Sequence, residues 1–141
     1  MVDNQIILFK FIKTNKNINW DNISYKYILS KNFIIEFQDK IDWHHISEYQ
    51  TLSENFIREF QNKVNWIYIS MHKKLSESFI REFQYKVNWR EISIRQKLSE
   101  NFIKEFKDKV NWHRILEYQK LSENFKNEFK HKLIKHKLNG R

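Results

Sequence analysis

Histidine carries the widest chemistry of any residue type in this chain, because imidazole binds metals and moves protons near neutral pH. The chain has six histidines and no cysteine. His44 and His45 are adjacent, so on a helix their side chains point about 100° apart. His113 is remote from both, and His131 and His136 are five residues apart. None of these is the i, i+4 pair of a zinc-binding helix, so the sequence predicts no metal site and no cofactor.

Phosphate binding and nucleophilic catalysis also lack their usual residues. The chain has one glycine, Gly140, and no proline, so a glycine-rich phosphate loop cannot form. Serines recur along the chain, but no histidine follows them at a fixed offset. We therefore expect that the chain is not an enzyme.

The tryptophans reveal how the chain is organised. The five tryptophans follow one another at intervals of 23 residues, at Trp20, Trp43, Trp66, Trp89 and Trp112. A fixed period of this size is typical of repeat architectures. The sequence predicts five repeats, at 19–41, 42–64, 65–87, 88–110 and 111–133.

Each repeat opens with a helix start signal. In the second repeat Asp42 stands directly before Trp43 and is a good N-cap residue. Trp43 and Ile46 are i, i+3 neighbours on one helix face, which predicts a first helix of about two turns over 43–50. Ser47 follows, and a small residue there would let another helix approach closely.

The second half of each repeat predicts a longer amphipathic helix. Ser53 is its expected N-cap. Phe56, Ile57, Phe60 and Val64 then form an apolar stripe at helical spacing.

An acidic residue precedes a lysine by four positions in this predicted helix. We interpret the pair as helix support. It recurs as Glu36–Lys40, Glu59–Lys63, Glu82–Lys86, Glu105–Lys109 and Glu128–Lys132.

One such repeat buries too little apolar surface to be stable alone, so neighbours must stack. The predicted fold is all-α: a right- or left-handed α-solenoid of five 23-residue helix–turn–helix repeats. Residues 1–18 are expected to cap the first repeat, and Lys126 gives the last repeat a polar outer face. Residues 134–141 are a basic tail. The apolar run at 6–12 is too short to span a membrane and lacks the features of a signal peptide.

The formal charge of +9 is spread unevenly along the chain. Residues 1–18 carry +2 and residues 126–141 carry +5, which leaves +2 for 19–125. The repeats therefore lack the excess of basic residues that is typical of a nucleic-acid-binding surface, and nucleic-acid binding is our second hypothesis. Its candidate residues lie on the second helices and towards the tail: Arg58, Arg81, Lys104, Lys126 and Lys130.

The repeats differ most at exposed positions of the first helix. In helical solenoids such a variable row selects the partner, so we expect a protein-interaction scaffold whose partner the sequence does not name. Repeat three has the most apolar residues at these positions, and exposed apolar and aromatic residues are candidates for binding hot spots. The other interpretation is that they pack against a neighbouring helix. A third hypothesis is a self-associating structural protein. The candidate partner-binding residues are His44, His45, Ile67, Tyr68, Met71, Arg90, Glu91, Ile94, His113 and Arg114.

The string LSENFIREFQNKVNW and its variants resemble short helical repeat proteins encoded in many copies by large DNA viruses of amoebae. The resemblance covers about residues 19–133. It implies a viral origin and a repeat architecture, with the host cytoplasm or the virion as location. It brings no catalytic residues and no identified partner.

Overall fold

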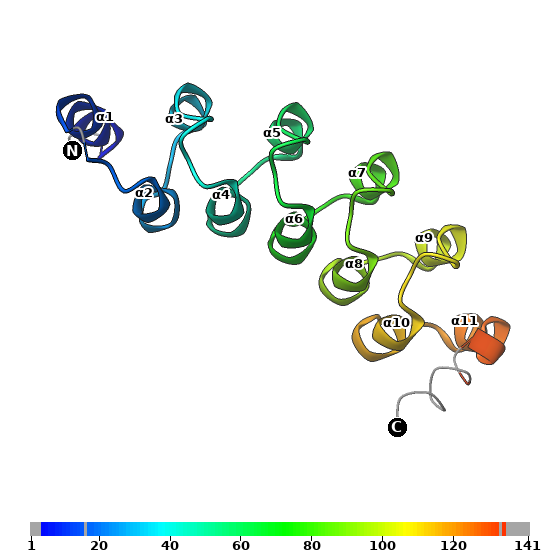
Figure 1. Cartoon of the computed structure of the whole chain (residues 1–141). Coiled ribbons are helices and arrows are strands. Elements are labelled where there is room, and N and C mark those ends of the chain that lie inside the picture. The colour runs from blue at the N-terminus through cyan, green and yellow to red at the C-terminus, as the bar shows by residue number, and fades with distance from the viewer. Residues whose placement is uncertain (1–3, 16, 133, 135–141) are drawn as a thin grey trace. The chain divides into compact units, whose positions relative to one another are not determined.

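The computed structural model describes residues 4–15, 17–132 and 134. These residues form helices and connecting turns without any strand. Helix pairs recur at a regular spacing and pack on one another (Figure 1). The predicted all-α, solenoid-like repeat fold is thus confirmed. The chain divides into two compact units, 1–65 and 66–141.

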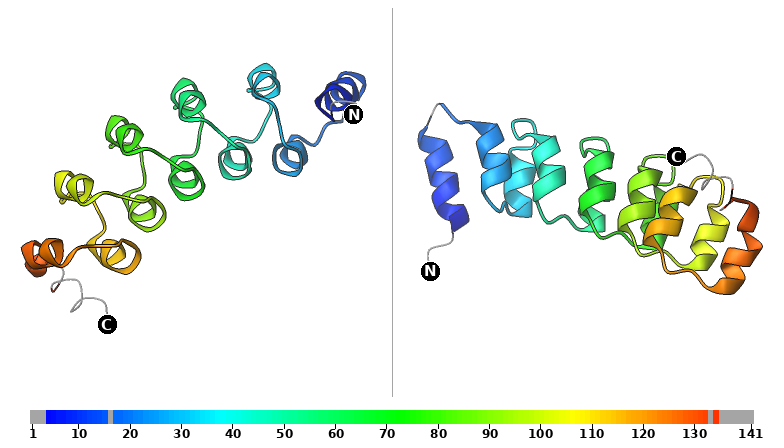
Figure 2. Two further views of the ribbon diagram at one scale, coloured as in Figure 1. Left: turned by 180° about the vertical axis from the view of Figure 1, so that it is seen from behind. Right: turned by 90° about the horizontal axis from the view of Figure 1, so that it is seen from below.

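Each unit has two layers of helices (Figures 1 and 2). In unit 1 the first helices α2 (Trp20–Lys26) and α4 (Trp43–Tyr49) form one layer. The other layer contains α1 (Asn4–Thr14), α3 (Lys31–Glu36) and α5 (Glu54–Glu59). In unit 2 the first helices are α6 (Trp66–His72), α8 (Trp89–Arg95) and α10 (Trp112–Tyr118), and the second helices are α7 (Glu77–Glu82), α9 (Glu100–Glu105) and α11 (Glu123–Glu128).

The predicted N-caps are present in the structure. Asp42 accepts a hydrogen bond from the His45 amide at the start of α4. Ser53 accepts one from the Phe56 amide at the start of α5. Each cap satisfies an amide that has no partner within its helix.

The second helices are shorter than predicted. Helix α5 ends at Glu59, and Phe60 adopts φ −107° and ψ 26°. The Phe60 carbonyl accepts hydrogen bonds from both Lys63 and Val64, at 2.9 and 3.1 Å. This tightened turn ends the helix. Val64 is buried as expected, although a turn and not a helix brings it to the core.

The predicted support from Glu–Lys pairs within each helix is wrong for Glu59 and Lys63, because the helix ends between the two residues. Lys63 instead binds Asp39 at 2.7 Å, and Glu59 binds Lys31 at 2.9 Å. Both partners belong to the preceding repeat. In unit 2 Arg81 binds Glu105, Lys104 binds Glu128 and Lys132 binds Asp108, so these charges also join neighbouring repeats.

The core of each repeat is an aromatic cluster between its two helices. Trp89 lies 5.0 Å from Phe106 between ring centroids, and Phe106 lies 4.7 Å from Phe102. The Trp89 indole N–H donates to the Gln84 carbonyl of the preceding repeat at 2.9 Å. Trp43 and Trp112 make the equivalent bonds to Gln38 and Lys107. The tryptophan therefore holds its own repeat together and also binds the one before it.

A buried glutamine ties successive repeats through their backbones. The Gln96 amide nitrogen donates to the carbonyls of Ser70 and Lys73, at 3.2 and 2.7 Å. Its side-chain oxygen accepts from the Leu75 amide at 2.9 Å. Gln50 and Gln119 make the equivalent three bonds. This glutamine was not singled out in the sequence.

The recurring serine of the first helix is also buried and bonded. Ser93 donates to the Trp89 carbonyl at 2.7 Å and accepts from the Asn111 amide at 3.0 Å. Its small size lets the next repeat begin against the helix, as expected. Leu116 occupies this position in the fifth repeat and cannot make such bonds.

Helix α1 lies against the second helix of the first repeat. Phe9 packs on Phe33 and Phe37, with ring centroids 5.0 and 5.8 Å apart. Leu8 and Ile12 of α1 are buried. The expected covering of this face by residues 1–18 is therefore seen for α1, while residues 135–141 of the predicted basic tail lie outside the described residues.

Replacing Gln96 by methionine should destabilise the protein by at least about 3 kcal/mol. The change keeps the side-chain volume but leaves one amide and two carbonyls without their partner, and unsatisfied buried groups cost about 1–3 kcal/mol each. Urea unfolding of Gln96→Met against the parent measures this. Gln38→Met is the control, because that amide is only half-buried and bonds its own turn. Equal losses in both variants would contradict the structural role of Gln96.

Candidate functional site

The predicted binding residues of unit 2 lie on its layer of first helices. Helix α6 packs on α8, and α8 packs on α10, so their side chains form one continuous surface. We call it the first-helix surface. It contains Ile67, Tyr68 and Met71 from α6, Arg90, Glu91 and Ile94 from α8, and His113 and Arg114 from α10.

The α6 part of this surface is apolar and accessible. Ile67 is 52% exposed. Tyr68 and Met71 are half-buried, as is Ile94 on α8. The Tyr68 ring lies 5.9 Å from the His72 ring, one turn further along the helix. These side chains offer apolar contact area next to polar atoms, which suits a protein partner.

The charged residues of the surface are partly occupied with one another. Glu91 is only 5% exposed and accepts from Arg90 at 2.8 Å. Its other oxygen lies 3.9 Å from Arg95. On α10, Arg114 binds Glu117 at 2.7 Å. Glu91 therefore helps to position two arginines and is itself largely withdrawn from a partner.

One of the two predicted histidines of unit 1, His45, lies in an aromatic cluster between α2 and α4. The ring centroid of His45 lies 5.5 Å from that of Tyr25 and 5.9 Å from that of Tyr49. Tyr25 and Tyr49 are themselves 6.3 Å apart. His44 is exposed. The tyrosines were absent from the predicted set, although their positions on the first helix were the signal that could have included them.

The basic residues of the nucleic-acid hypothesis are mostly paired. Arg81 binds Glu105 through Nε at 2.8 Å, Lys104 binds Glu128 and Lys126 binds Glu123 at 2.7 Å. Arg58 donates to Asn55 at 2.9 Å, and Lys130 is exposed. Charge that is already matched by carboxylates attracts phosphates weakly.

The structure gathers no metal-binding cluster in the residues it describes: no group of three or more His, Asp or Glu side chains is placed to hold an ion. His136, one of the histidines considered above, lies outside those residues. Within the same part of the chain, no helix combines the length and the apolar character that a membrane span requires.

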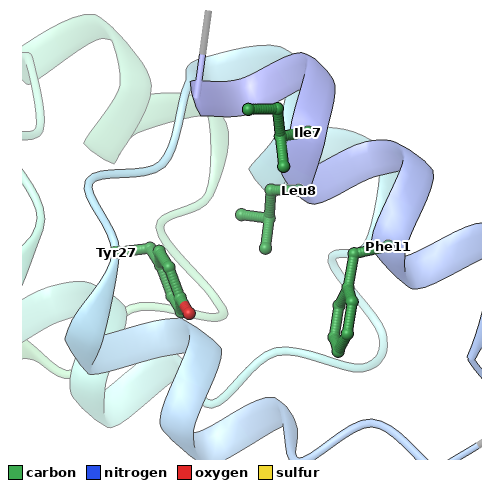
Figure 3. Close-up of a pocket in the computed structure, with 4 residues that line it drawn as sticks. All are labelled: Ile7, Leu8, Phe11 and Tyr27. Atoms are coloured by element: carbon green, nitrogen blue, oxygen red, sulfur yellow. The ribbon is translucent and has the colours of Figure 1, made fainter.

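A shallow apolar pocket lies between α1 and the segment that follows α2. Ile7, Leu8 and Phe11 of α1 face Tyr27 across a space of about 340 Å³ (Figure 3). Ile7, Phe11 and Tyr27 are each at least half exposed. This face of α1 points away from the aromatic cluster that it covers with Phe9.

The comparisons with known proteins add no family. No protein-family model matches the chain, and neither the curated proteins nor the solved structures gave a match.

One carboxylate has a perturbed pKa. Glu100 accepts hydrogen bonds from the Ser122 amide at 2.6 Å and from the Ser122 hydroxyl at 3.1 Å. The amide bond is the main cause that lowers the pKa of Glu100 below its usual 4.5; desolvation opposes it, and the hydroxyl and Lys104 reinforce it. Glu77 makes the equivalent bond to the Ser99 amide.

The contribution of Glu100 to stability should depend on pH. A carboxylate whose pKa is lower in the folded state stabilises that state above its unfolded pKa, and this stabilisation is lost as the pH falls through the folded value. The stability difference between the parent and Glu100→Gln should therefore be largest near neutral pH and shrink below about pH 4.5. Urea unfolding from pH 3 to 7 measures it. Glu36→Gln is the control, since no backbone amide of the described residues bonds that carboxylate. A pH-independent difference would refute the assignment.

Proposed function

We propose that the protein is a non-enzymatic repeat scaffold that binds another protein through the first-helix surface of unit 2. The helix pairs provide the scaffold, and the residues of α6, α8 and α10 that vary between repeats determine which partner binds.

This proposal rests on one observation: some positions of the first helix keep the same residue in successive repeats, whereas others vary. Ile69, Ile92 and Ile115 recur at one position of the first helices, and none of them is exposed. Ile67, two residues before Ile69, is exposed and is replaced by Arg90 and His113 in the next two repeats. The core is therefore kept while the outer residues change, as in solenoids that bind partners along one surface.

The chemistry of the surface favours a protein over other partners. Isoleucine, tyrosine, methionine and arginine are residue types suited to the centre of protein interfaces. The polar groups buried beneath this surface, such as Ser93 and Gln96, are engaged in bonds between repeats. These buried polar groups are therefore structural, and the exposed residues of the first-helix surface are the ones that would contact a partner.

Removing Tyr68 and Met71 should weaken partner binding at least tenfold. These side chains supply contact area at the α6 part of the surface, and a tenfold loss corresponds to about 1.4 kcal/mol. The probe is a peptide selected from a displayed library on the full chain, with its Kd measured by fluorescence anisotropy. The variant Tyr68→Ala/Met71→Ala is compared with Tyr85→Ala, which removes an exposed tyrosine from the turn after α7. Unchanged affinity in the double variant would exclude this surface.

The apolar face of α1 favours self-association as a second candidate function. Ile7, Phe11 and Tyr27 expose apolar area around one pocket, and Ile28 is 87% exposed close by in sequence. Exposed apolar patches of this kind mark interaction sites. A second copy of the chain could cover this face through its own α1.

Changing Phe11 to glutamate should reduce such self-association, because a carboxylate in an apolar contact is costly to desolvate. Light scattering over a concentration series should show association in the parent and a lower average mass in Phe11→Glu. Lys13→Gln lies on the same helix and shifts the charge by the same amount, so it should behave like the parent. A parent that stays monomeric throughout the series would reject this candidate.

A further inference from the structure

The chain's net charge is confined to the second unit. Residues 1–65 contain eight basic and eight acidic residues, whereas residues 66–141 contain 18 basic and nine acidic residues. The formal charge of +9 therefore belongs entirely to unit 2.

Part of this charge forms a row along one edge of unit 2. Lys74, Lys97 and Lys120 occupy the same position in three successive repeats, just after α6, α8 and α10. The first two repeats have Ile28 and Thr51 there. All three lysines are exposed. Since packed helices lie about 10 Å apart, the row places a positive charge about every 10 Å along these loops. We call it the lysine row.

Two hollows lie between the successive loops that carry the lysine row. One, of about 400 Å³, is lined by Lys74 and Lys97 together with Met71. The other, of about 440 Å³, is lined by Lys97 and Lys120 together with Ile94. Arg95 lines both hollows, and none of the residues that the structure places around either one is acidic. Each hollow thus combines positive charge with an apolar contact.

The nearby carboxylates are engaged elsewhere. Glu77 and Glu100 accept hydrogen bonds from the backbone amides of Ser99 and Ser122. Glu91 is held by Arg90 and lies near Arg95. Among the described residues, no carboxylate lies within 4.0 Å of an amine of the lysine row. Its charge is therefore available to a ligand.

The geometry points to an acidic, extended protein segment as the ligand, and we propose that the lysine row binds one. Three residues of a peptide in the extended polyproline II conformation span about 9 Å and return to the same face, so an acidic residue at every third position would meet each lysine in turn. Apolar side chains between them would enter the hollows beside Met71 and Ile94. This proposal rests on the proposed function and gives the chemical class of the partner.

The hollows suit a nucleic acid less well. Single-stranded nucleic acids bind through a positive groove together with successive aromatic platforms. Tyr118 lines one hollow and His72 the other, but Arg95 occupies the same position in the repeat between them, so successive repeats do not each present an aromatic ring. Both amide donors of Gln96 and of Gln119 are spent on carbonyls of the preceding repeat, so neither side-chain amide is left to read a base edge.

A designed peptide with glutamate at every third position and isoleucine between tests the proposal. Fluorescence anisotropy on the full chain should show binding that weakens with salt, and the same peptide with glutamine for glutamate should bind at least tenfold more weakly. The triple variant Lys74→Gln/Lys97→Gln/Lys120→Gln should lose at least tenfold in affinity. The control Lys86→Gln/Lys107→Gln/Lys109→Gln has the same charge change away from the row and should bind within about twofold of the parent. Circular dichroism checks that each variant is folded.

Three outcomes would overturn the proposal: equal losses in both triple variants, no preference for glutamate, or displacement of the peptide by a single-stranded oligonucleotide that binds the row more tightly. A separate binding measurement tests the proposed function. A library-selected peptide that depends on Tyr68 and Met71 but not on the lysine row would leave the scaffold function standing while this inference fails.

Discussion

The backbone ends of very short helices set the main constraint on this structure. A helix leaves its first four amides and last four carbonyls without internal partners, so a helix of six or seven residues satisfies few of its own polar groups. Neighbouring repeats supply the missing partners. Gln96 bonds two carbonyls and one amide of the preceding repeat, Ser93 accepts from the Asn111 amide, and Trp112 donates to the Lys107 carbonyl. The tryptophan and phenylalanine clusters give the repeats their core, but these polar bonds decide how one repeat is placed on the next.

The pattern of apolar residues and caps was enough to predict the fold class. The spacing of the tryptophans gave the repeat, and Asp42 and Ser53 marked the starts of two helices correctly. The spacing of the apolar residues did not predict where the second helix ends. Val64 has the right spacing for a helix and is buried, yet a turn at Phe60 brings it there. Burial follows from the apolar side chain, whereas the backbone path depends on which amides compete for one carbonyl.

The candidate site was only partly predictable for related reasons. Variation between repeats located the first-helix surface, but it could not show that Glu91 is buried between arginines. The buried glutamine looked like an ordinary surface residue, and only its recurrence as Gln50, Gln96 and Gln119 could have indicated its role. The total charge of residues 19–125 does not reveal the lysine row, because the net charge of −2 on residues 19–65 offsets part of the positive charge of the later repeats. Its signal in the sequence is the recurrence of lysine at one position of three successive repeats.

The direction of the glutamine bonds has a consequence for how the protein is made. Gln119 satisfies carbonyls of Ser93 and Gln96, so the fourth repeat depends on residues that the ribosome has yet to add. At about 5–20 residues per second, the next 23 residues take roughly one to five seconds to appear. During that interval the newest repeat carries unmet backbone groups and an open apolar face. Nascent chains of this kind gain their stability stepwise, one repeat behind the growing end.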